Sequence, residues 1–348
     1  MPQGAPLLMH MKGNTLFNYL KMNPKISIVI PVYGVEPYIE KCARSLFGQT
    51  LDDLEFIFVD DCTKDQSIEV VKKVLLEYPH REEQTIFIKH KCNKGLPSAR
   101  KTGILAAKGE YIYHCDSDDW VDVRFCEEMY QKAVDDNYDI LISDYYVTID
   151  GVDTQKAGSS SLDCLTKEKI VLLLLSGKIP FMVWNKLIKN DIYKQIEDYP
   201  ISTHAEDLGL ILQLAFFAKK IGYLPKAYYH YIADSNTAIH QLNEEKYLKN
   251  FYESIGNAKL VEDFYRKHSA FDQFKNGIVY MKLIQRDRLL PIINDSKYYM
   301  LWKQTFPEIN SHIIFNPEIS LVHKIKYLLI KFRLSFLINL LDRRHPAL

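Results

Sequence analysis

The run Ile26-Ser-Ile-Val-Ile-Pro-Val-Tyr33 is apolar almost throughout, as expected of a strand that is buried on both faces of a sheet. A helical pattern follows it, and three more apolar runs, each separated by a helical pattern, occupy residues 54–60, 85–89 and 111–115. Buried strands that alternate with helices are typical of a parallel sheet between helical layers. The sequence therefore predicts an α/β fold with a mostly parallel sheet flanked by helices.

Polar side chains gather where these predicted strands end. Asp60-Asp61 follows the second strand, Asn93-Lys94-Gly95 follows the third, and Asp116-Ser117-Asp118-Asp119 follows the fourth. The carboxyl ends of parallel strands meet at the sheet edge where ligands bind. Carboxylates this close repel one another unless a cation neutralises them, and oxygen ligands suit Mg²⁺ or Mn²⁺. We expect the cluster at 116–119 to bind a divalent metal, the alternative being an acidic turn that caps the next helix.

The composition is that of a globular protein without a global charge. The chain has 348 residues, 47% of them hydrophobic, and Lys+Arg and Asp+Glu balance at 44 each. Nucleic-acid binding therefore has no support from composition. The six cysteines form no CxxC pair, which favours a reduced, cytoplasmic setting. We identify neither a signal peptide nor the roughly 18 consecutive apolar residues that a membrane-spanning helix needs.

Changes in pattern predict how the chain is divided. Residues 1–24 form an N-terminal extension, 25–240 a sheet domain and 241–348 a helical C-terminal region. The sheet domain itself divides into halves at 25–150 and 151–240. Within the second half, the Gly- and Ser-containing residues 151–162 predict a flexible loop.

The segment 321–341 has the pattern of a basic amphipathic helix. Its apolar face includes Leu321, Leu328, Phe332 and Phe336, and several Lys and Arg residues add positive charge. Such a helix is typical of peripheral contact with an anionic membrane, here the inner face of the cell membrane. The competing interpretation is a helix packed on the core or on the second subunit of a homodimer.

Several short motifs occur in a fixed order in the first part of the chain: Ser27-Ile-Val-Ile-Pro-Val-Tyr33, Ser45-Leu-Phe-Gly-Gln-Thr50, Phe58-Val-Asp-Asp61, Asn93-Lys-Gly95 with Ser98-Ala-Arg100, Gly109-Glu-Tyr-Ile112 and Asp116-Ser-Asp-Asp-Trp120. In this order and spacing they resemble the inverting family 2 glycosyltransferases with a GT-A fold. The resemblance is dense over residues 25–144 and continues weakly to 238.

The resemblance implies a UDP-sugar donor bound by the half at 25–150. The expected donor contacts at the strand ends are Pro31, Val32, Tyr33, Asp60, Asp61 and Arg100. The first three would line the nucleoside, the two aspartates would bond the uracil, and the arginine would lie near polar donor groups. Asp116 and Asp118 match the family's DxD pair, with Asp118 the more direct ligand of Mn²⁺ or Mg²⁺. Asp119 would contact a sugar hydroxyl or add a second metal contact.

Inversion needs a base that deprotonates the acceptor hydroxyl. Glu206-Asp207, just before a helical run at 208–218, resembles the family's acidic ED motif. We expect Asp207 to be the base and Glu206 to orient it or contact the acceptor, with His204 a weaker candidate. The other interpretation is a pair of acids stabilised by a helix N-terminus. Trp184 would either stack on an acceptor sugar or belong to the core.

These features predict a metal-dependent inverting glycosyltransferase. It would move one hexose or N-acetylhexosamine from a UDP-sugar to a hydroxyl of a glycan or lipid-linked glycan, in cell-surface polysaccharide or glycolipid synthesis. One alternative is a sugar nucleotidyltransferase, which would need a glycine-rich basic loop that Gly34-Val-Glu36 does not provide. The other is a non-catalytic partner in glycan assembly.

Overall fold

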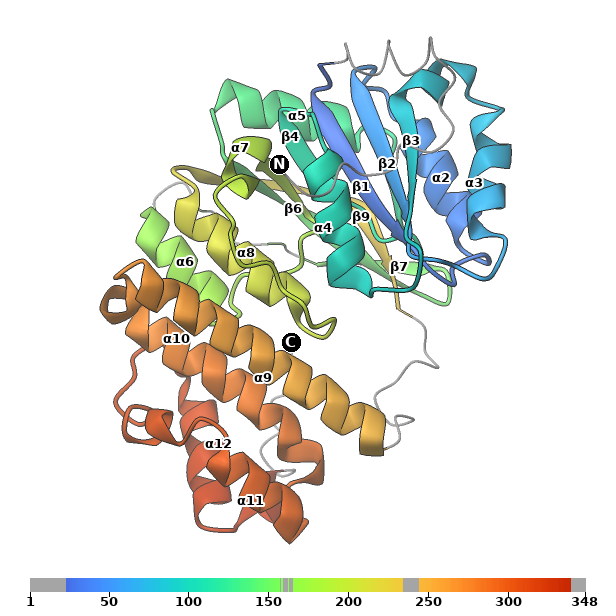
Figure 1. The fold of residues 1–348 in the computed structure, drawn as a ribbon. Coiled ribbons are helices and arrows are strands. Elements are labelled where there is room, and N and C mark those ends of the chain that lie inside the picture. The colour runs from blue at the N-terminus through green and yellow to red at the C-terminus, as the bar shows by residue number, and fades with distance from the viewer. Residues whose placement is uncertain (1–22, 157, 159–161, 163–164, 234–243, 339–348) are drawn as a thin grey trace, which may run out of the picture.

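The computed structural model describes residues 23–156, 158, 162, 165–233 and 244–338 (Figure 1). The predicted extension at 1–24 therefore lies almost wholly outside the described residues. The first half alternates strands and helices in the predicted order: β1 (Ile26–Val32), α2 (Ile39–Phe47), β2 (Leu54–Asp60), α3 (Ser67–Leu75), β3 (Thr85–Lys89), α4 (Leu96–Ala106) and β4 (Tyr111–His114).

The second half completes the sheet. Its elements are β5 (Trp120–Val121), α5 (Phe125–Asp135), β6 (Ile140–Ile149), β7 (Val152–Lys156), α6 (Lys167–Leu175), β8 (Lys186–Lys189), α7 (Asn190–Tyr193), α8 (Glu206–Phe217) and β9 (Ile221–Ile232). Among the described residues the strand order is β3-β2-β1-β4-β8-β6-β9-β5, with β7 paired to β6. The α/β prediction is confirmed, and the parallel pairing holds from β1 to β4.

The later strands join this parallel part with mixed polarity. β8 is antiparallel to both β4 and β6, whereas β6 and β9 are parallel. In the parallel part, Val32 lies beside Asp60, and Asp60 beside Lys89. The carboxyl ends of β1, β2 and β3 are therefore level, which gathers their following loops at one edge.

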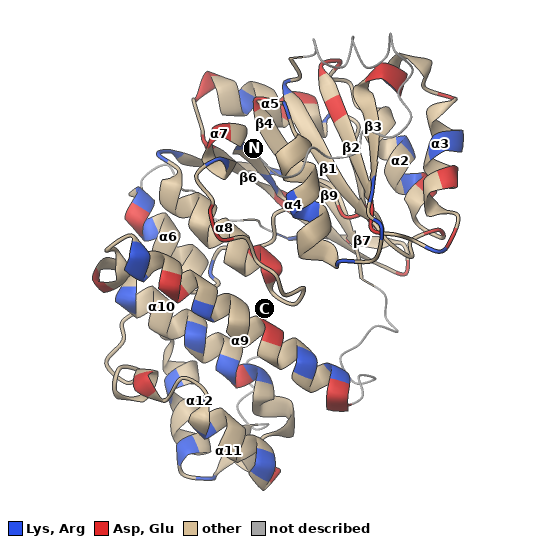
Figure 2. Ribbon diagram, in the orientation of Figure 1, with Lys and Arg blue, Asp and Glu red and all other residues tan. Residues whose placement is uncertain are grey.

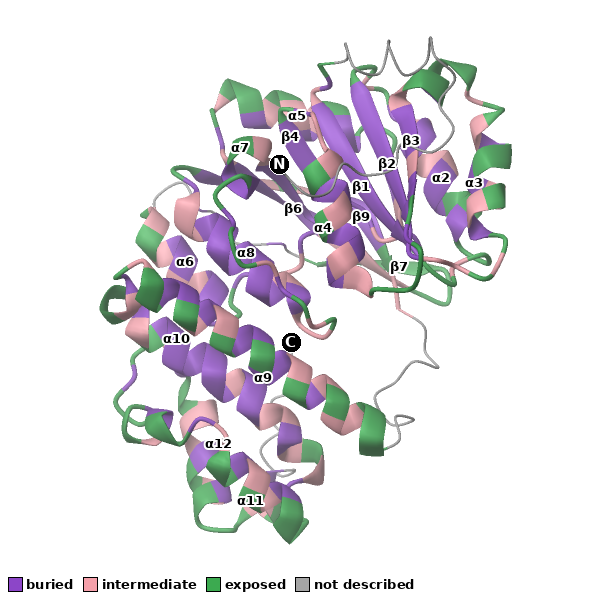
Figure 3. Cartoon of the chain, viewed as in Figure 1, coloured by how far each residue is buried: buried purple, intermediate pink, exposed green. Residues whose placement is uncertain are grey.

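The two faces of the sheet belong to two hydrophobic cores. Ile28 and Phe56 pack with α2, α3 and α5, whereas Val29 and Ile57 pack with α4, α6 and α8. This follows from the two-residue period of a strand, which sends neighbouring side chains to opposite faces. Figure 3 shows the strands buried between these helical layers. At Gly103 of α4, an added Cβ would lie 2.4 Å from Val29 Cγ1, so glycine permits this close packing on β1.

The C-terminal helices extend the second core. They are α9 (Glu244–Lys267), α10 (Phe271–Arg286), η3 (Asp287–Ile292), α11 (Ser296–Gln304), η4 (Pro307–Ser311), α12 (Leu321–Lys331) and η5 (Ser335–Leu337). Figure 1 shows them beyond α6 and α8, on the side away from β3. Their buried residues form one continuous cluster with α8 and the sheet face. Basic and acidic residues alternate along α9 (Figure 2).

Two predicted segments differ from the structure. Residues 152–156, expected in a flexible loop, form β7, because they pair with β6 as a hairpin at Asp150 and Gly151, both with positive φ. The helix expected over 321–341 ends at Lys331, because the chain turns at Arg333, whose φ is 58°. Residues 339–341 lie outside the described residues. In the described part of the chain, no helix has the length and apolarity required to cross a bilayer.

Candidate active site

The carboxylate of Asp61 fixes the start of α4. Its Oδ1 accepts hydrogen bonds from the Lys94 amide (2.9 Å) and from His90 Nδ1 (2.7 Å), and its Oδ2 accepts one from the Gly95 amide (2.8 Å). Gly95, with φ 85°, is the residue before the helix. These bonds hold the loop after β3 against the end of β2. The uracil contact expected of Asp61 stays a prediction, and Oδ2 retains a second lone pair for it.

The other expected donor contacts also lie at this edge. Pro31 and Val32 are buried at the end of β1, whereas Tyr33 is 49% exposed. Asp60 accepts from the Thr63 amide at 2.8 Å and lies 3.2 Å from Lys89 Nζ. The exposed ring of Tyr33 is thus available for stacking. The carboxylate of Asp60, in contrast, already accepts the hydrogen bond that fixes the turn after β2.

Arg100 lies at the centre of the site. Its Nη2 donates to Asp116 Oδ1 at 2.7 Å, its Nε lies 2.7 Å from Glu206 Oε1, and Nη2 lies 3.8 Å from Asp207 Oδ1. The side chain is only 3% exposed. One guanidinium thus joins the first acid of the cluster at 116–119 to both acids of the predicted base motif.

Burial and charge oppose one another around this guanidinium. Burial raises the pKa of Asp116 to about 6, although Arg100 acts to lower it. Burial likewise raises the pKa of Glu206 well above its ordinary value against the same cation. Burial alone would lower the pKa of Arg100, but Asp116, Glu206 and Asp207 raise it overall. The arginine therefore stays charged, whereas burial opposes ionisation of the carboxyls around it.

The members of the acidic cluster have different environments. Asp118 is exposed, and the Asp116 side chain is 26% exposed. Asp119 is 2% exposed, and its oxygens accept from the Tyr229 hydroxyl (2.5 Å) and the Ile232 amide (2.8 Å) of β9. Burial, followed by Asp118 and Asp116, raises the pKa of Asp119 to about 8. Asp119 thus ties the cluster to β9, and its expected sugar or metal contact stays a prediction.

The donor chemistry fits a magnesium- or manganese-type cation. Asp116 and Asp118 supply carboxylate oxygens, and such cations are commonly held by one or two carboxylates together with substrate phosphates. In the described residues, no three His, Cys, Asp or Glu side chains converge to form a metal site by themselves. Asp116 and Asp118 are therefore the residues that would hold such a cation, and their role as metal ligands stays a prediction.

Glu206 and Asp207 form the first turn of α8. The preceding Ala205 has left-handed backbone angles (φ 61°, ψ 30°), which are strained for a residue with a Cβ. The side chain of Glu206 is 5% exposed and that of Asp207 17%. Asp207 Oδ1 is buried without a hydrogen-bond partner in the described structure. The role of Asp207 as the base, with Glu206 as its neighbour, stays a prediction.

The segment before β8 is held by a lysine that the sequence did not single out. Lys186 is fully buried, and its Nζ donates to the Pro180 carbonyl (2.7 Å), the Met182 carbonyl (2.6 Å) and Asn185 Oδ1 (2.8 Å). Burial lowers its pKa to about 7, opposed by Asp207. A lone lysine beside an apolar strand gives no sequence signal of this role.

Aromatic packing decides between the alternatives for Trp184 and shows the environment of His230. Trp184 is 4% exposed and stacks on Tyr229 with ring centroids 4.3 Å apart, which assigns it to the core. His230 points to the other face of β9 and stacks between Trp120 (3.4 Å) and Tyr146 (4.6 Å). His114 and Tyr193 form a further buried contact (2.9 Å) beside Arg100, and neither was expected at the site.

A model of the family described as glycosyl transferase family 2 matches residues 27–200, half of the chain. The chain belongs to glycosyltransferase family 2. It is 31% identical over 263 residues to the putative glycosyltransferase EpsH of Bacillus subtilis, covering 73% of this chain and 71% of EpsH. It is 29% identical over 280 residues to a poly(ribitol-phosphate) beta-glucosyltransferase of Bacillus spizizenii, covering 74% of this chain and 42% of that protein.

The fold of this family 2 glycosyltransferase is also similar to a solved structure. The crystal structure of S. aureus TarS 1–349 in complex with UDP-GlcNAc matches with a TM-score of 0.53 and 16% identity, over 87% of this chain and 91% of that one. At this identity the likeness establishes the fold alone. The predicted GT-A fold and the predicted family are both confirmed.

Proposed function

We propose that this glycosyltransferase moves a single sugar, a hexose or N-acetylhexosamine, from a UDP-sugar to a glycan hydroxyl with inversion. The observation that carries the proposal is the position of Arg100, between Asp116 on the donor side and Glu206 and Asp207 on the acceptor side. It brings a phosphate-side cluster and a base next to one another. The TarS complex with UDP-GlcNAc supports the choice of a UDP-sugar.

The donor half supplies recognition and charge. Pro31, Val32 and Tyr33 line the nucleoside, and Asp61, with Asp60, bonds the uracil. Asp116 and Asp118 hold Mn²⁺ or Mg²⁺, which when bound supplies positive charge to the leaving diphosphate. Arg100 and Asp119 support this cluster from the protein side, and Asp119 is proposed to contact a sugar hydroxyl or to add a second metal contact.

The acceptor half supplies the proton acceptor. Asp207 takes the hydroxyl proton while the acceptor oxygen bonds the anomeric carbon, and the bond from that carbon to the diphosphate breaks with its electron pair going to UDP. Glu206, held by Arg100, keeps Asp207 oriented. Orientation and preorganised charge supply most of the rate.

The acceptor is proposed to be a glycan or lipid-linked glycan of a cell-surface polysaccharide or glycolipid. The segment 321–338, which contains α12 and η5, supports contact with a membrane. Leu321 (72%), Phe332 (66%) and Phe336 (62%) are exposed, and the segment contains four Lys or Arg and no acidic side chains (Figure 2). We infer that this apolar and basic surface rests on an anionic lipid surface, the inner face of the cell membrane. There a lipid-linked acceptor would be within reach.

Two substitutions test the assignment. Asp118→Ala and Asp207→Asn should each lower transfer by about 100-fold or more, the range expected for loss of a metal ligand or a general base, while leaving thermal unfolding unchanged. Asp191→Asn, at an exposed acid on α7 (75% exposed), is the control. Donor hydrolysis is measured over a panel of UDP-sugars with and without Mn²⁺.

The same measurement separates the alternatives. Wild-type turnover in either variant would remove the role given to that residue. Pyrophosphate release from UTP and a sugar phosphate, with no hydrolysis of any UDP-sugar, would instead identify a nucleotidyltransferase.

A further inference from the structure

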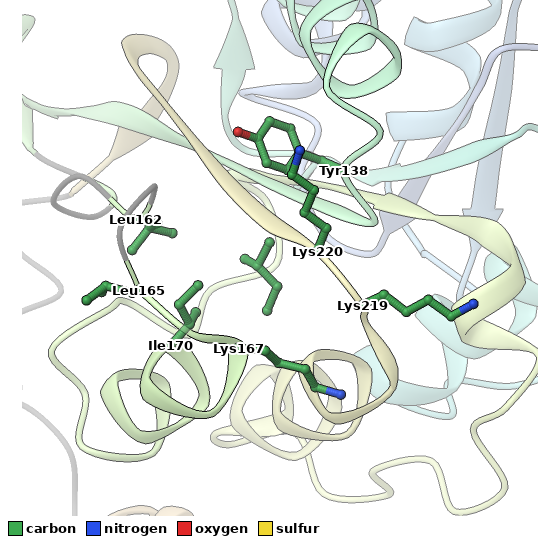
Figure 4. Close-up of a pocket in the computed structure, with 8 residues that line it drawn as sticks. Tyr138, Leu162, Leu165, Lys167, Ile170, Lys219 and Lys220 are labelled. Atoms are coloured by element: carbon green, nitrogen blue, oxygen red, sulfur yellow. The ribbon is translucent and has the colours of Figure 1, made fainter.

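The cavities away from the acidic cluster differ in whether their charged side chains already have hydrogen-bond partners within the protein. One of about 270 Å³ lies where α6 and the end of α8 approach the start of β9 (Figure 4), lined by Tyr138, Leu162, Leu165, Lys167, Ile170, Lys219, Lys220 and Ile221. Lys167 donates to the Phe216 carbonyl, and Lys220 donates to the Asp136 carbonyl while lying over the Tyr138 ring. Both lysines therefore already donate to carbonyls at the ends of α8 and α5. We make no proposal for this cavity.

A second cavity, which we name the Arg288 pocket, lies between α9, η3 and the segment that leads into α8. Its volume is about 360 Å³, and it is lined by His204, Tyr247, Asn250, Phe251, Asp287, Arg288, Leu290 and Pro291. His204 is three residues before Asp207 in the chain. The pocket therefore adjoins the segment that carries the proposed base.

Arg288 brings a charge to this pocket that the protein does not neutralise. Its Nε donates to Gln285 Oε1 at 2.8 Å, and its Nη1 lies 2.5 Å from His204 Nε2. Within the described residues no carboxylate forms an ion pair with it, and burial lowers its pKa. A guanidinium carries five N–H donors, so three remain for a ligand.

The neighbouring charged groups differ in their partners. Asp287 accepts from Trp302 Nε1 at 2.9 Å through Oδ1, its Oδ2 is buried without a hydrogen-bond partner in the described structure, and the charge of the buried Arg286 acts on it. Glu253 accepts from the His204 amide at 2.9 Å and lies 3.9 Å from Lys249 Nζ. Burial and the charge of Arg288 lower the pKa of His204, so its ring is neutral at pH 7. Because Arg286 offsets the charge of Asp287, Arg288 brings a positive charge to the pocket without a carboxylate ion pair among the described residues.

We propose that the Arg288 pocket binds a phosphate-type anion attached to a carbon-rich group. The guanidinium matches the oxygens of a phosphate, and Tyr247, Phe251 and Leu290 offer apolar walls to what the phosphate carries. The anion belongs to the acceptor, whose hydroxyl would then lie near Asp207. That last step rests on the proposed function, whereas the affinity of the pocket for phosphate does not.

Binding is tested by calorimetry on the full chain with EDTA present, so that no metal holds phosphate elsewhere. The probes are inorganic phosphate, glucose 1-phosphate and farnesyl phosphate, with methyl glucoside as the neutral control. Arg288→Gln should weaken all three phosphate probes by about tenfold or more, and Arg288→Lys by less, because a charged hydrogen-bond donor remains. Arg266→Gln, at a 52% exposed arginine of α9, should leave binding unchanged.

The results distinguish a lipid-linked anion from a phosphorylated glycan. They also distinguish failure of this inference from failure of the proposed function. Tighter binding of farnesyl phosphate assigns the pocket to a lipid-linked group, and tighter binding of glucose 1-phosphate assigns it to a phosphorylated glycan. Equal phosphate affinity in wild type and in a folded Arg288→Gln variant would overturn the inference, even if UDP still bound. Failure of the wild type to bind UDP in a separate titration with Mn²⁺, with phosphate binding in EDTA intact, would instead remove the proposed function alone.

Discussion

At the scale of single residues, Arg100 joins the acidic cluster at 116–119 to Glu206 and Asp207. The sequence motif placed it near the donor, but its contact with Glu206 could not be predicted because it joins α4 to α8, far apart in the chain. The acids at the strand ends were predictable, since strand period and order put them on one edge. The bonds of Asp119 to β9 were not, because they depend on how a distant strand pairs.

Arg100→Gln should destabilise the fold by about 3–5 kcal/mol, because it leaves the buried Glu206 and part of Asp116 without their cation. Urea unfolding at pH 7 measures this difference. Arg44→Gln is the matched control: Arg44 pairs with Glu40 and Glu77 on the surface, and we expect little change there. Wild-type stability of Arg100→Gln would mean that the surrounding carboxyls are protonated in the resting protein.

At the scale of elements, local sequence patterns predicted the strands and helices of the first half of the chain well. They predicted less well the segments that are ordered only by pairing or by contacts with other elements. Strands β1 to β4 and their helices follow from apolar runs that each carry their own signal. The strand β7 was missed because its residues are all exposed and only pairing with β6 orders them. The segment before β8 is likewise ordered by Lys186, a contact without a sequence pattern.

Lys186→Met tests how that segment is held. Since burial lowers the pKa of Lys186 to about 7 from 10.5 in the unfolded chain, the unfolded state binds more protons between these values. The wild type should therefore gain stability relative to the variant as pH rises through this window, by about 1.4 kcal/mol per pH unit. Urea unfolding from pH 7 to 10 measures the slope. A difference between the two proteins that does not change with pH would show that the three acceptors keep the ammonium charged.

At the scale of the whole molecule, the sheet and the C-terminal helices share a core. The sequence predicted a helical region after 240 but not its packing, because a helical pattern shows that a face is apolar without showing what covers it. The same limit applies to α12. Tyr327 and Ile330 are buried on the core, whereas the exposed Leu321 and Phe332 leave an apolar surface.

Cosedimentation with vesicles tests what covers that surface. Binding should require anionic phosphatidylglycerol vesicles and be weak with phosphatidylcholine. The double variant Phe332→Ser, Phe336→Ser should bind about tenfold more weakly, because two rings no longer leave water. Tyr252→Ser, at a ring 56% exposed on α9, serves as the control. A wild-type dimer that the double variant dissociates, without vesicle binding in either, would assign the surface to a second subunit.

The core that runs from the sheet face through α8 into α9 and α10 also limits how such a protein can diversify. A helical region that folded by itself could be exchanged between relatives as a cassette, carrying a new acceptor preference with it. Here α8, α9 and α10 are part of the same interior that stabilises the sheet. A substitution on the buried faces of these helices therefore also alters the packing of the sheet.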